Sequence, residues 1–329
     1  MQVCMLISGQ EDVTWQQWLA LVGAAEESGV EGIFSSDHYL SDIREDRGSL
    51  DAWAILAALA GSTNRVRLGT LVSPATFHHP SKLAKMVATV DHISGGRVEL
   101  GLGAGWNERE HLAYGFPFPQ KRVRMELVEE ALEIVLRSWS EDSFSFEGRH
   151  YQLKDCPALP KPLQQPHPPL IVGSSGSRRS LDLAARFADE YNALLPSVEE
   201  CRERRGRLVE ACETMGRDPA SIRLSVMTGC VIGADRGELL QRAQLALRRS
   251  GLENEDPAAL LAQRRDIWVT GTVDEAIQRI REFEEIGVER VYLQHVAQPD
   301  VEMVRLIGAA IVPAVSRHAP GTLDEASVR

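Results

Sequence analysis

The chain has 329 residues, 43% of them hydrophobic and 25% charged, which is the composition of an ordinary globular protein and not of a disordered one. Its formal net charge of −11 at pH 7 argues against nucleic acid or an anionic membrane surface as a partner. The length permits a single domain over residues 1–329, because α/β barrels reach about 250 residues and beyond as one unit.

The sequence shows no sign of a targeting signal or a membrane span. Residues 1–8 are apolar but lack a basic flank and a small-residue cleavage site, so they predict a first strand. The longest apolar stretch, residues 50–60, is far shorter than the roughly 20 residues of a membrane span. The five cysteines have no CxxC spacing, which indicates reduced thiols in a cytoplasmic protein without a cysteine metal site.

Short β-rich runs alternate with longer amphipathic stretches along the chain, a pattern typical of repeated βα units. Strands are expected at about residues 2–8, 31–36, 66–72, 98–103, 169–174, 189–194, 222–232 and 289–294. Helices are expected at about residues 15–28, 51–60, 80–93, 124–139, 177–187, 198–215, 238–249 and 273–286, the last closed by Gly287. Eight strands joined by helices predict a TIM-type (β/α)₈ barrel.

Two insertions interrupt this alternation, at about residues 141–168 and 250–266. The first contains the alternating run 144–151 around Glu147-Gly148, which predicts a hairpin, followed by a proline-rich connector. In the second, glycine, proline and mixed charge break the helical period. Both insertions are expected to belong to the barrel domain.

The active sites of such barrels lie at the C-terminal ends of the strands. The second strand is followed by Asp37 and His38, and an imidazole that titrates near pH 6.5 can donate or accept a proton there. The alternative is that Asp37 caps the loop and His38 only packs. His78 and His79 follow the third strand, but adjacent side chains diverge at a helix start, so no metal site is expected.

The fourth strand runs into the glycine-rich segment Gly101-Leu102-Gly103-Ala104-Gly105. Glycines at every second position clear space on one face of a strand, where a flat ring could lie against the backbone. The same pattern also occurs where helices pack tightly.

The fifth strand ends in Gly173-Ser174-Ser175-Gly176-Ser177-Arg178 just before a helix. Hydroxyls, arginine and free backbone N–H groups at a helix N-terminus predict an anion site, here the best phosphate candidate. The alternative is an ordinary serine-capped helix.

Taken together, these segments resemble the luciferase-like monooxygenase family, and within it the branch of oxidoreductases that depend on the deazaflavin coenzyme F420. The resemblance is carried by Phe77-His78-His79-Pro80, Ser94-Gly95-Gly96-Arg97 and the run from Gly101 to Glu110. It extends along the chain through Ser36-Asp37-His38, Val172-Gly173-Ser174 and Gly271-Thr272-Val273-Asp274-Glu275.

The resemblance implies a ring cofactor over the strand ends, with its phosphate near the fifth strand. It also implies a non-prolyl cis peptide at Leu71–Val72, where Val72 would support one face of the ring. With the strand-end reasoning, it gives this cofactor-binding set: Asp37, His38, Leu71, Val72, Gly103, Ala104, Gly105, Trp106, Asn107, Gly173, Ser174, Ser175, Gly176 and Arg178.

The proton-transferring group follows less directly from the resemblance. Some relatives have a catalytic glutamate directly after the glycine turn, where this chain has Trp106. The catalytic candidates are therefore His38 first and Glu108 second. Trp106 either shapes the substrate pocket or packs.

The expected activity is hydride transfer between C5 of F420 and a small organic substrate, with His38 supplying or removing the proton. Two alternatives remain open, an FMN-dependent monooxygenase and a non-catalytic flavin-binding barrel. The resemblance further implies a homodimer.

Overall fold

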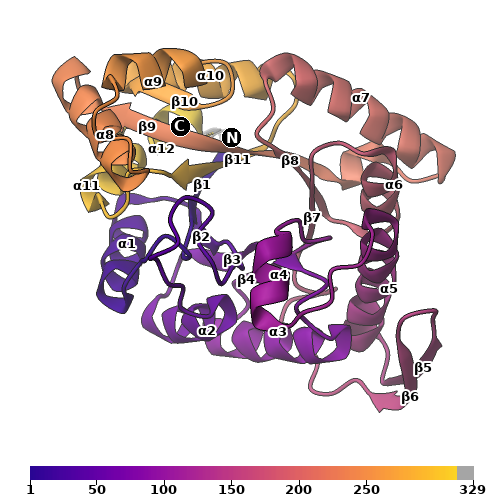
Figure 1. Ribbon diagram of the computed structural model, residues 1–329. Helices are drawn as coiled ribbons and strands as arrows, with labels where there is room; N and C mark the ends of the chain where they lie inside the picture. Colours follow the sequence, from indigo (N-terminus) through magenta and orange to yellow (C-terminus); the bar gives the residue numbers. More distant parts are fainter. Residues whose placement is uncertain (317–329) are drawn as a thin grey trace, which may run out of the picture.

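Eight parallel strands close into a barrel in the computed structural model, which describes residues 1–316 (Figure 1). In their order around the barrel they are β1 (Gln2–Ile7), β2 (Gly32–Ser35), β3 (Arg67–Pro74), β4 (Val98–Gly103), β7 (Leu170–Ser174), β8 (Glu190–Leu194), β9 (Arg223–Gly233) and β11 (Arg290–His295). β11 pairs with β1, so the sheet has no open edge there. The predicted TIM-type fold is confirmed, and each predicted strand is present to within two residues at either end.

Helices surround the barrel in chain order (Figure 1). They are α1 (Trp15–Ser28), α2 (Ala52–Ser62), α3 (Pro80–Ser94), α5 (Lys121–Ser140), α6 (Arg178–Phe187), α7 (Val198–Thr214), α8 (Arg236–Arg249) and α10 (Val273–Glu285), with α11 (Val301–Leu306), a π-helical turn (Ile307–Ile311) and α12 (Val312–Val315) at the end. A 3₁₀ turn, Pro219–Ser221, precedes β9. One apolar core lies between the sheet and this layer of helices.

Local signals in the sequence explain where several helices begin and end. Thr14 accepts from the N–H of Gln17 at 3.3 Å, and the Gln17 side chain accepts from the N–H of Thr14 at 2.9 Å, a capping box for α1. Gly29 ends that helix with φ 89°. Gly287 has φ 87° just after α10, as the sequence predicts.

Besides the short helix α4 (Glu108–Tyr114), four short elements lie outside the eight strand–helix units. β5 (Ser143–Glu147) and β6 (Gln152–Pro157) form the predicted antiparallel hairpin, which packs on α5 outside the ring of helices (Figure 1). α9 (Pro257–Arg264) and β10 (Val269–Thr272) were not expected, and β10 adds a parallel strand to the end of β9. That residues 1–329 act as a single domain stays a prediction.

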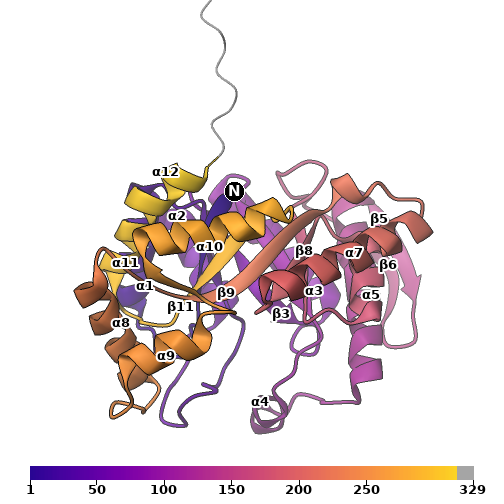
Figure 2. The same ribbon diagram turned by 90° about the horizontal axis from the view of Figure 1, so that it is seen from above.

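The two ends of the barrel differ. Figure 2 shows the short helix α4 (Glu108–Tyr114) at one end, with the N-terminus and α12 at the other. The barrel interior is filled by apolar side chains that include Leu6, Phe34 and Tyr292.

None of the helices within residues 1–316 is long and apolar enough to cross a membrane.

Candidate functional site

A cavity of about 510 Å³ opens at the C-terminal ends of the barrel strands. Strands from around the whole barrel contribute to it, with Leu6 from β1, Val172 from β7, Asn192 from β8, Met227 from β9 and Gln294 from β11. Of the residues predicted to bind cofactor, these line the cavity: His38, Leu71, Val72, Gly103, Ala104, Gly105, Trp106, Gly173, Ser174 and Ser175. Their binding role stays a prediction.

Val72 shapes one wall of this cavity. The peptide bond between Leu71 and Val72 is cis, as the family resemblance implies. A Cβ atom added to Gly103 would lie 2.6 Å from Cγ2 of Val72, and one added to Gly173 would lie 2.7 Å from its Cγ1. Gly103 and Gly173 therefore make room for the Val72 side chain, and the contact of a ring with the glycine-rich end of β4 stays a prediction.

Asp37 lies behind this wall and not in the cavity lining. Its Oδ2 accepts from the hydroxyl of Ser73 at 2.6 Å and bonds Nε2 of His78 at 2.8 Å. Trp53 donates its ring N–H to the same Ser73 hydroxyl at 3.0 Å. Asp37 thus fixes the end of β3 from the side, and its predicted contact with cofactor has no support in this arrangement.

His38 and Glu110 form a close pair at the edge of the cavity. Nδ1 of His38 is 2.8 Å from Oε2 of Glu110, and the two side chains are 14% and 1% exposed. The other carboxylate oxygen accepts the backbone N–H groups of Tyr39 and Leu40. An ionised carboxylate only accepts hydrogen bonds, so Nδ1 of His38 carries a hydrogen.

The pair changes the acidity of both partners. Burial by itself lowers the pKa of His38, but the hydrogen bond and charge of Glu110, followed by the charges of Asp42 and Asp37, outweigh it and raise that pKa. Burial likewise raises the pKa of Glu110, but the bond and charge of His38 and the two backbone N–H groups bring it below its usual value. The pair therefore favours imidazolium beside carboxylate.

Glu108 does not reach the site. It is the exposed first residue of α4, and Asn107, also predicted to bind cofactor, caps that helix by accepting from the N–H of Glu110 at 3.2 Å. Because α4 begins at Glu108, the glutamate that turns toward His38 is Glu110. The spacing Asn107-x-x-Glu110 resembles a capping box and could have revealed this helix start. Trp106 is 61% exposed and lies edge-to-face with His38, with ring centroids 5.7 Å apart.

The opposite side of the cavity is suited to an anion. The Ser177 hydroxyl caps α6 by accepting from the N–H of Ser180, and the Ser174 and Ser180 hydroxyls are 2.5 Å apart. The first N–H groups of a helix have no partner within it. Lys121 and Arg124 of α5 line the same cavity and add positive charge.

Two predicted residues of this segment lie outside the lining. Arg178 is exposed at the start of α6, and Gly176 turns with φ 96° beside the Arg204 side chain. The cations that face the cavity therefore come from α5, which is about fifty residues earlier in the sequence. No local pattern near residue 178 signals them.

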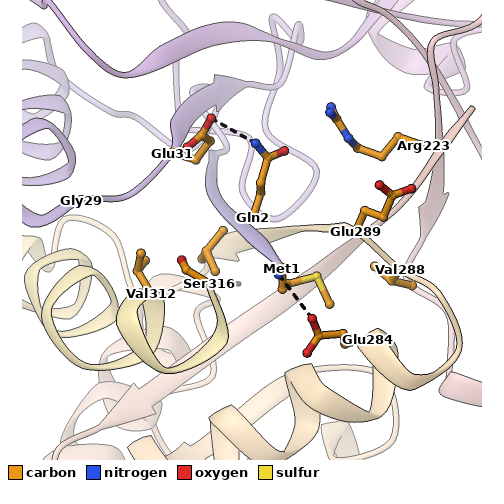
Figure 3. Close-up of a pocket in the computed structure, with 11 residues that line it drawn as sticks. Met1, Gln2, Gly29, Glu31, Arg223, Glu284, Val288, Glu289, Val312 and Ser316 are labelled. Atoms are coloured by element: carbon orange, nitrogen blue, oxygen red, sulfur yellow. Dashed lines mark hydrogen bonds and ion pairs between the residues drawn. The ribbon is translucent and has the colours of Figure 1, made fainter. Parts of the chain in front are cut away.

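A second hollow, of about 360 Å³, lies at the other end of the barrel (Figure 3). Several of its residues precede or begin strands, among them Gln2, Glu31, Arg223 and Glu289. Gln2 donates to Glu31 at 3.2 Å across it. In barrels of this type the strand starts serve stability and the strand ends carry chemistry, so the candidate active site is the cavity beside His38.

Comparison with known proteins gives the family. The family described as luciferase-like monooxygenase matches residues 2–290. An uncharacterised protein of Mycobacterium tuberculosis is 37% identical over 157 residues, 48% of this chain and 54% of that protein. The F420-dependent glucose-6-phosphate dehydrogenase of Microbacterium testaceum is 26% identical over 316 residues, 89% of this chain and 91% of that protein.

Among solved structures, the monooxygenase RslO1 from Streptomyces bottropensis superimposes with a TM-score of 0.82 at 24% identity, covering 96% of this chain and 100% of that one. This likeness concerns the fold alone. The chain spans about half the length of the uncharacterised relative, whereas the family match runs from β1 to the first residue of β11. The chain belongs to the luciferase-like monooxygenase family.

Proposed function

We propose that this family member is an oxidoreductase that uses coenzyme F420 and transfers hydride between C5 of the deazaflavin and a small organic substrate. One observation carries the proposal: a single cavity joins a cationic, hydroxyl-rich end at α5 and α6 to a proton-transferring end at His38. β7 and β1 stand on opposite sides of the eight-stranded ring, so the cavity spans the barrel mouth. The F420-dependent relative aligned over 89% of the chain supports this coenzyme.

The residues present fit a ligand with a flat ring and an anionic tail. Leu71 and Val72 offer an apolar surface to a ring, and Lys121, Arg124 and the start of α6 offer positive charge to the tail. When bound, the coenzyme supplies the hydride chemistry. The chain's part is to hold the ring and substrate together, exclude water and move a proton at His38.

Equilibrium titration of the apo-protein with F420 and with FMN tests the cofactor. F420 should bind, and Lys121→Gln should weaken it by about fivefold, since one partly solvated charge contact is lost. Arg122→Gln is the matched control, because Arg122 is the next residue of α5, is 74% exposed and pairs with Glu126. Tight binding of FMN without binding of F420 would favour the FMN-dependent monooxygenase instead.

His38→Ala tests whether the site is catalytic. The variant should still bind F420, with a loss of affinity much smaller than its loss of turnover, which we expect to be about 10²- to 10⁴-fold, the usual contribution of a positioned acid or base. Full turnover in this variant would rule out the role of His38. A protein that binds F420 but never exchanges hydride would be the non-catalytic flavin-binding barrel.

We also propose a homodimer in the cytoplasm, which the family resemblance supports. Exposed apolar side chains of α3 and the adjoining connector, Ile93, Leu159 and Leu163, are candidates for the interface. The connector lies along α3, since the carbonyl of Leu159 accepts from Lys85 and the N–H of Leu163 donates to Asp91. Sedimentation of the wild type and of Leu159→Asp tests this, and a monomeric wild type would refute it.

A further inference from the structure

The orientation of His38 is set by a carboxylate that lies outside the cavity lining. Glu110 is absent from the residues that line the cavity, yet it bonds Nδ1 of His38 and two successive backbone N–H groups of the same loop. His38 itself lines the cavity. Its Nε2 has no hydrogen-bond partner within residues 1–316 and is the ring nitrogen left for a bound substrate.

The charged groups around His38 are mostly acidic. Glu110 faces it from α4, and Asp42 and Asp37 face it from its own loop. Asp42 is itself held by the Asn107 side chain, which donates to it at 2.7 Å. On α4, Arg109 turns away to the carbonyl of Ser41 and to Glu45. From the turn before α4, the neutral Trp106 ring lies beside His38, with ring centroids 5.7 Å apart.

This surrounding favours the doubly protonated imidazole. Glu110 accepts the hydrogen bond from Nδ1, so the protonation state of Nε2 decides the chemistry. Protonated Nε2 donates a proton, and unprotonated Nε2 accepts one. The net upward shift in the pKa of His38 extends the donating state to higher pH. A group that arrives at Nε2 therefore meets a proton donor.

We propose that Glu110 is a positioning residue that fixes His38 as the proton donor, and that the site reduces an uncharged carbonyl compound. This rests on the proposed use of F420. An uncharged substrate is indicated because Leu6, Leu71, Leu195 and Met227 line the cavity together with neutral amides. The lining cations belong to α5, and the lining carboxylate, Asp42, acts on His38. A carbonyl is indicated because its oxygen needs a proton as hydride reaches its carbon.

The step balances as follows. The carbonyl carbon gains a hydride, two electrons with one proton, from the reduced deazaflavin, and the C=O π bond opens. The oxygen takes the proton of His38 Nε2, which leaves an alcohol, oxidised coenzyme and neutral His38. His38 then takes a proton from solvent, and solvent receives the proton that the coenzyme gives up on oxidation.

The first test needs no bound coenzyme. NMR titration of imidazole signals in the apo-protein, with His38 assigned by its loss in His38→Gln, measures the His38 pKa directly. Glu110→Gln should lower it by about one to two units, because a close opposite charge is removed. Glu45→Gln, which removes a 91% exposed carboxylate beside α4, should leave it unchanged. An unaltered His38 pKa in Glu110→Gln would overturn the positioning role.

The second test measures direction, with cyclohexanone and benzaldehyde as substrates and oxidation of reduced F420 as the readout. Reduction should lose rate as pH rises through the His38 pKa, and Glu110→Gln should move that loss to lower pH by the shift seen in the NMR titration. A loss that stays in place, or a protein that binds F420 but neither reduces these carbonyls nor oxidises cyclohexanol, would overturn the proposal.

Two further variants keep the test decisive. If Glu110→Gln does not fold, Glu110→Asp should retain most of the upward shift in the His38 pKa. Asp42→Asn should lower the His38 pKa by less than the loss of the hydrogen-bonded Glu110 carboxylate would. No change in Asp42→Asn would count against the acidic surrounding. Failure of F420 to bind in the titration of the apo-protein would refute the proposed function while leaving the NMR result on Glu110 standing.

Discussion

Val72 shows how a single side chain decides the shape of the candidate site. Its two methyl groups fill the space beside Gly103 and Gly173 and leave its outer surface toward the cavity. Because protein interiors are close-packed, one added methyl group at either glycine must displace a neighbour. The glycines are therefore tied to the position of Val72 and through it to the cavity wall.

Gly173→Ala tests this dependence. The new methyl group would lie 2.7 Å from Val72, so we expect a loss of about 1–3 kcal/mol in unfolding free energy and weaker binding of F420. Adding Val72→Ala should restore much of the stability, a coupling that urea unfolding of the double mutant detects. Gly23→Ala is the control, since its Cβ meets nothing within 4 Å in α1 and should gain up to about 1 kcal/mol. Equal stability of Gly173→Ala and wild type would contradict the packing argument.

The candidate residues also show where sequence patterns stop being informative. A site role for His38 could be predicted because the sequence itself shows a histidine directly after a predicted strand. Glu110 is distinguished from Glu108 only if Asn107 is recognised as the cap that starts α4, because a shift of two residues moves a side chain to another face of a helix. Lys121 lines the cavity only because the closed barrel packs α5 against β4 and α6, and no spacing in the sequence encodes that.

At the scale of elements, α4 is a short helix held by contacts made outside it. Seven residues are too few for a stable isolated helix. Buried His111 bonds Thr76 at 2.7 Å and the carbonyl of Asn107 at 2.6 Å, which joins α4 to the segment after β3. Its placement fixes Glu110 and hence His38.

We expect Asn107→Ala to loosen α4 without unfolding the barrel. The change removes the helix cap, worth about 1 kcal/mol, and also the bond to Asp42. Amide hydrogen exchange should become faster in residues 107–115 and 38–42 and stay unchanged in the barrel strands. Asn107→Asp keeps the cap acceptor but loses the donor to Asp42, so it should protect α4 better than Asn107→Ala. Identical exchange in all three proteins would show that the cap does not hold α4.

The same comparison explains which elements the sequence could predict. The eight strands follow from apolar runs bounded by turn residues, and each lies in the barrel. α9 and β10 were not predicted because Pro257 and the mixed charges around it break the periodicity on which such predictions depend. β10 has only four residues and becomes a strand by pairing with the end of β9.

At the scale of the whole molecule, a buried charge network crosses the barrel interior. Arg290 of β11 lies 2.6 Å from Glu99 of β4 and 3.1 Å from Glu190 of β8, and Glu99 also binds Arg67 of β3. The Tyr292 hydroxyl donates to Glu190 at 2.7 Å. These bonds join early and late strands, so they stabilise the closed barrel and depend on it.

This network predicts how the stability of the protein depends on pH. Burial alone raises the pKa of Glu99, but Arg290 and Arg67 outweigh it and bring that pKa below the ordinary 4.5. A carboxyl whose pKa is lowered by folding contributes stability above its unfolded pKa and loses it as pH falls through the folded pKa.

Glu99→Gln should therefore be less stable than wild type by about 3–5 kcal/mol at neutral pH, because Arg290 loses a buried partner. The difference should shrink as pH falls below about 4.5, where wild type itself loses the contribution of Glu99. Urea unfolding of both proteins from about pH 7 to about pH 3 measures it, with the exposed Glu45→Gln as control. A difference that stays constant over this range would mean that Glu99 does not hold its charge through the Arg290 network, and that packing, not ionisation, explains its place in the barrel.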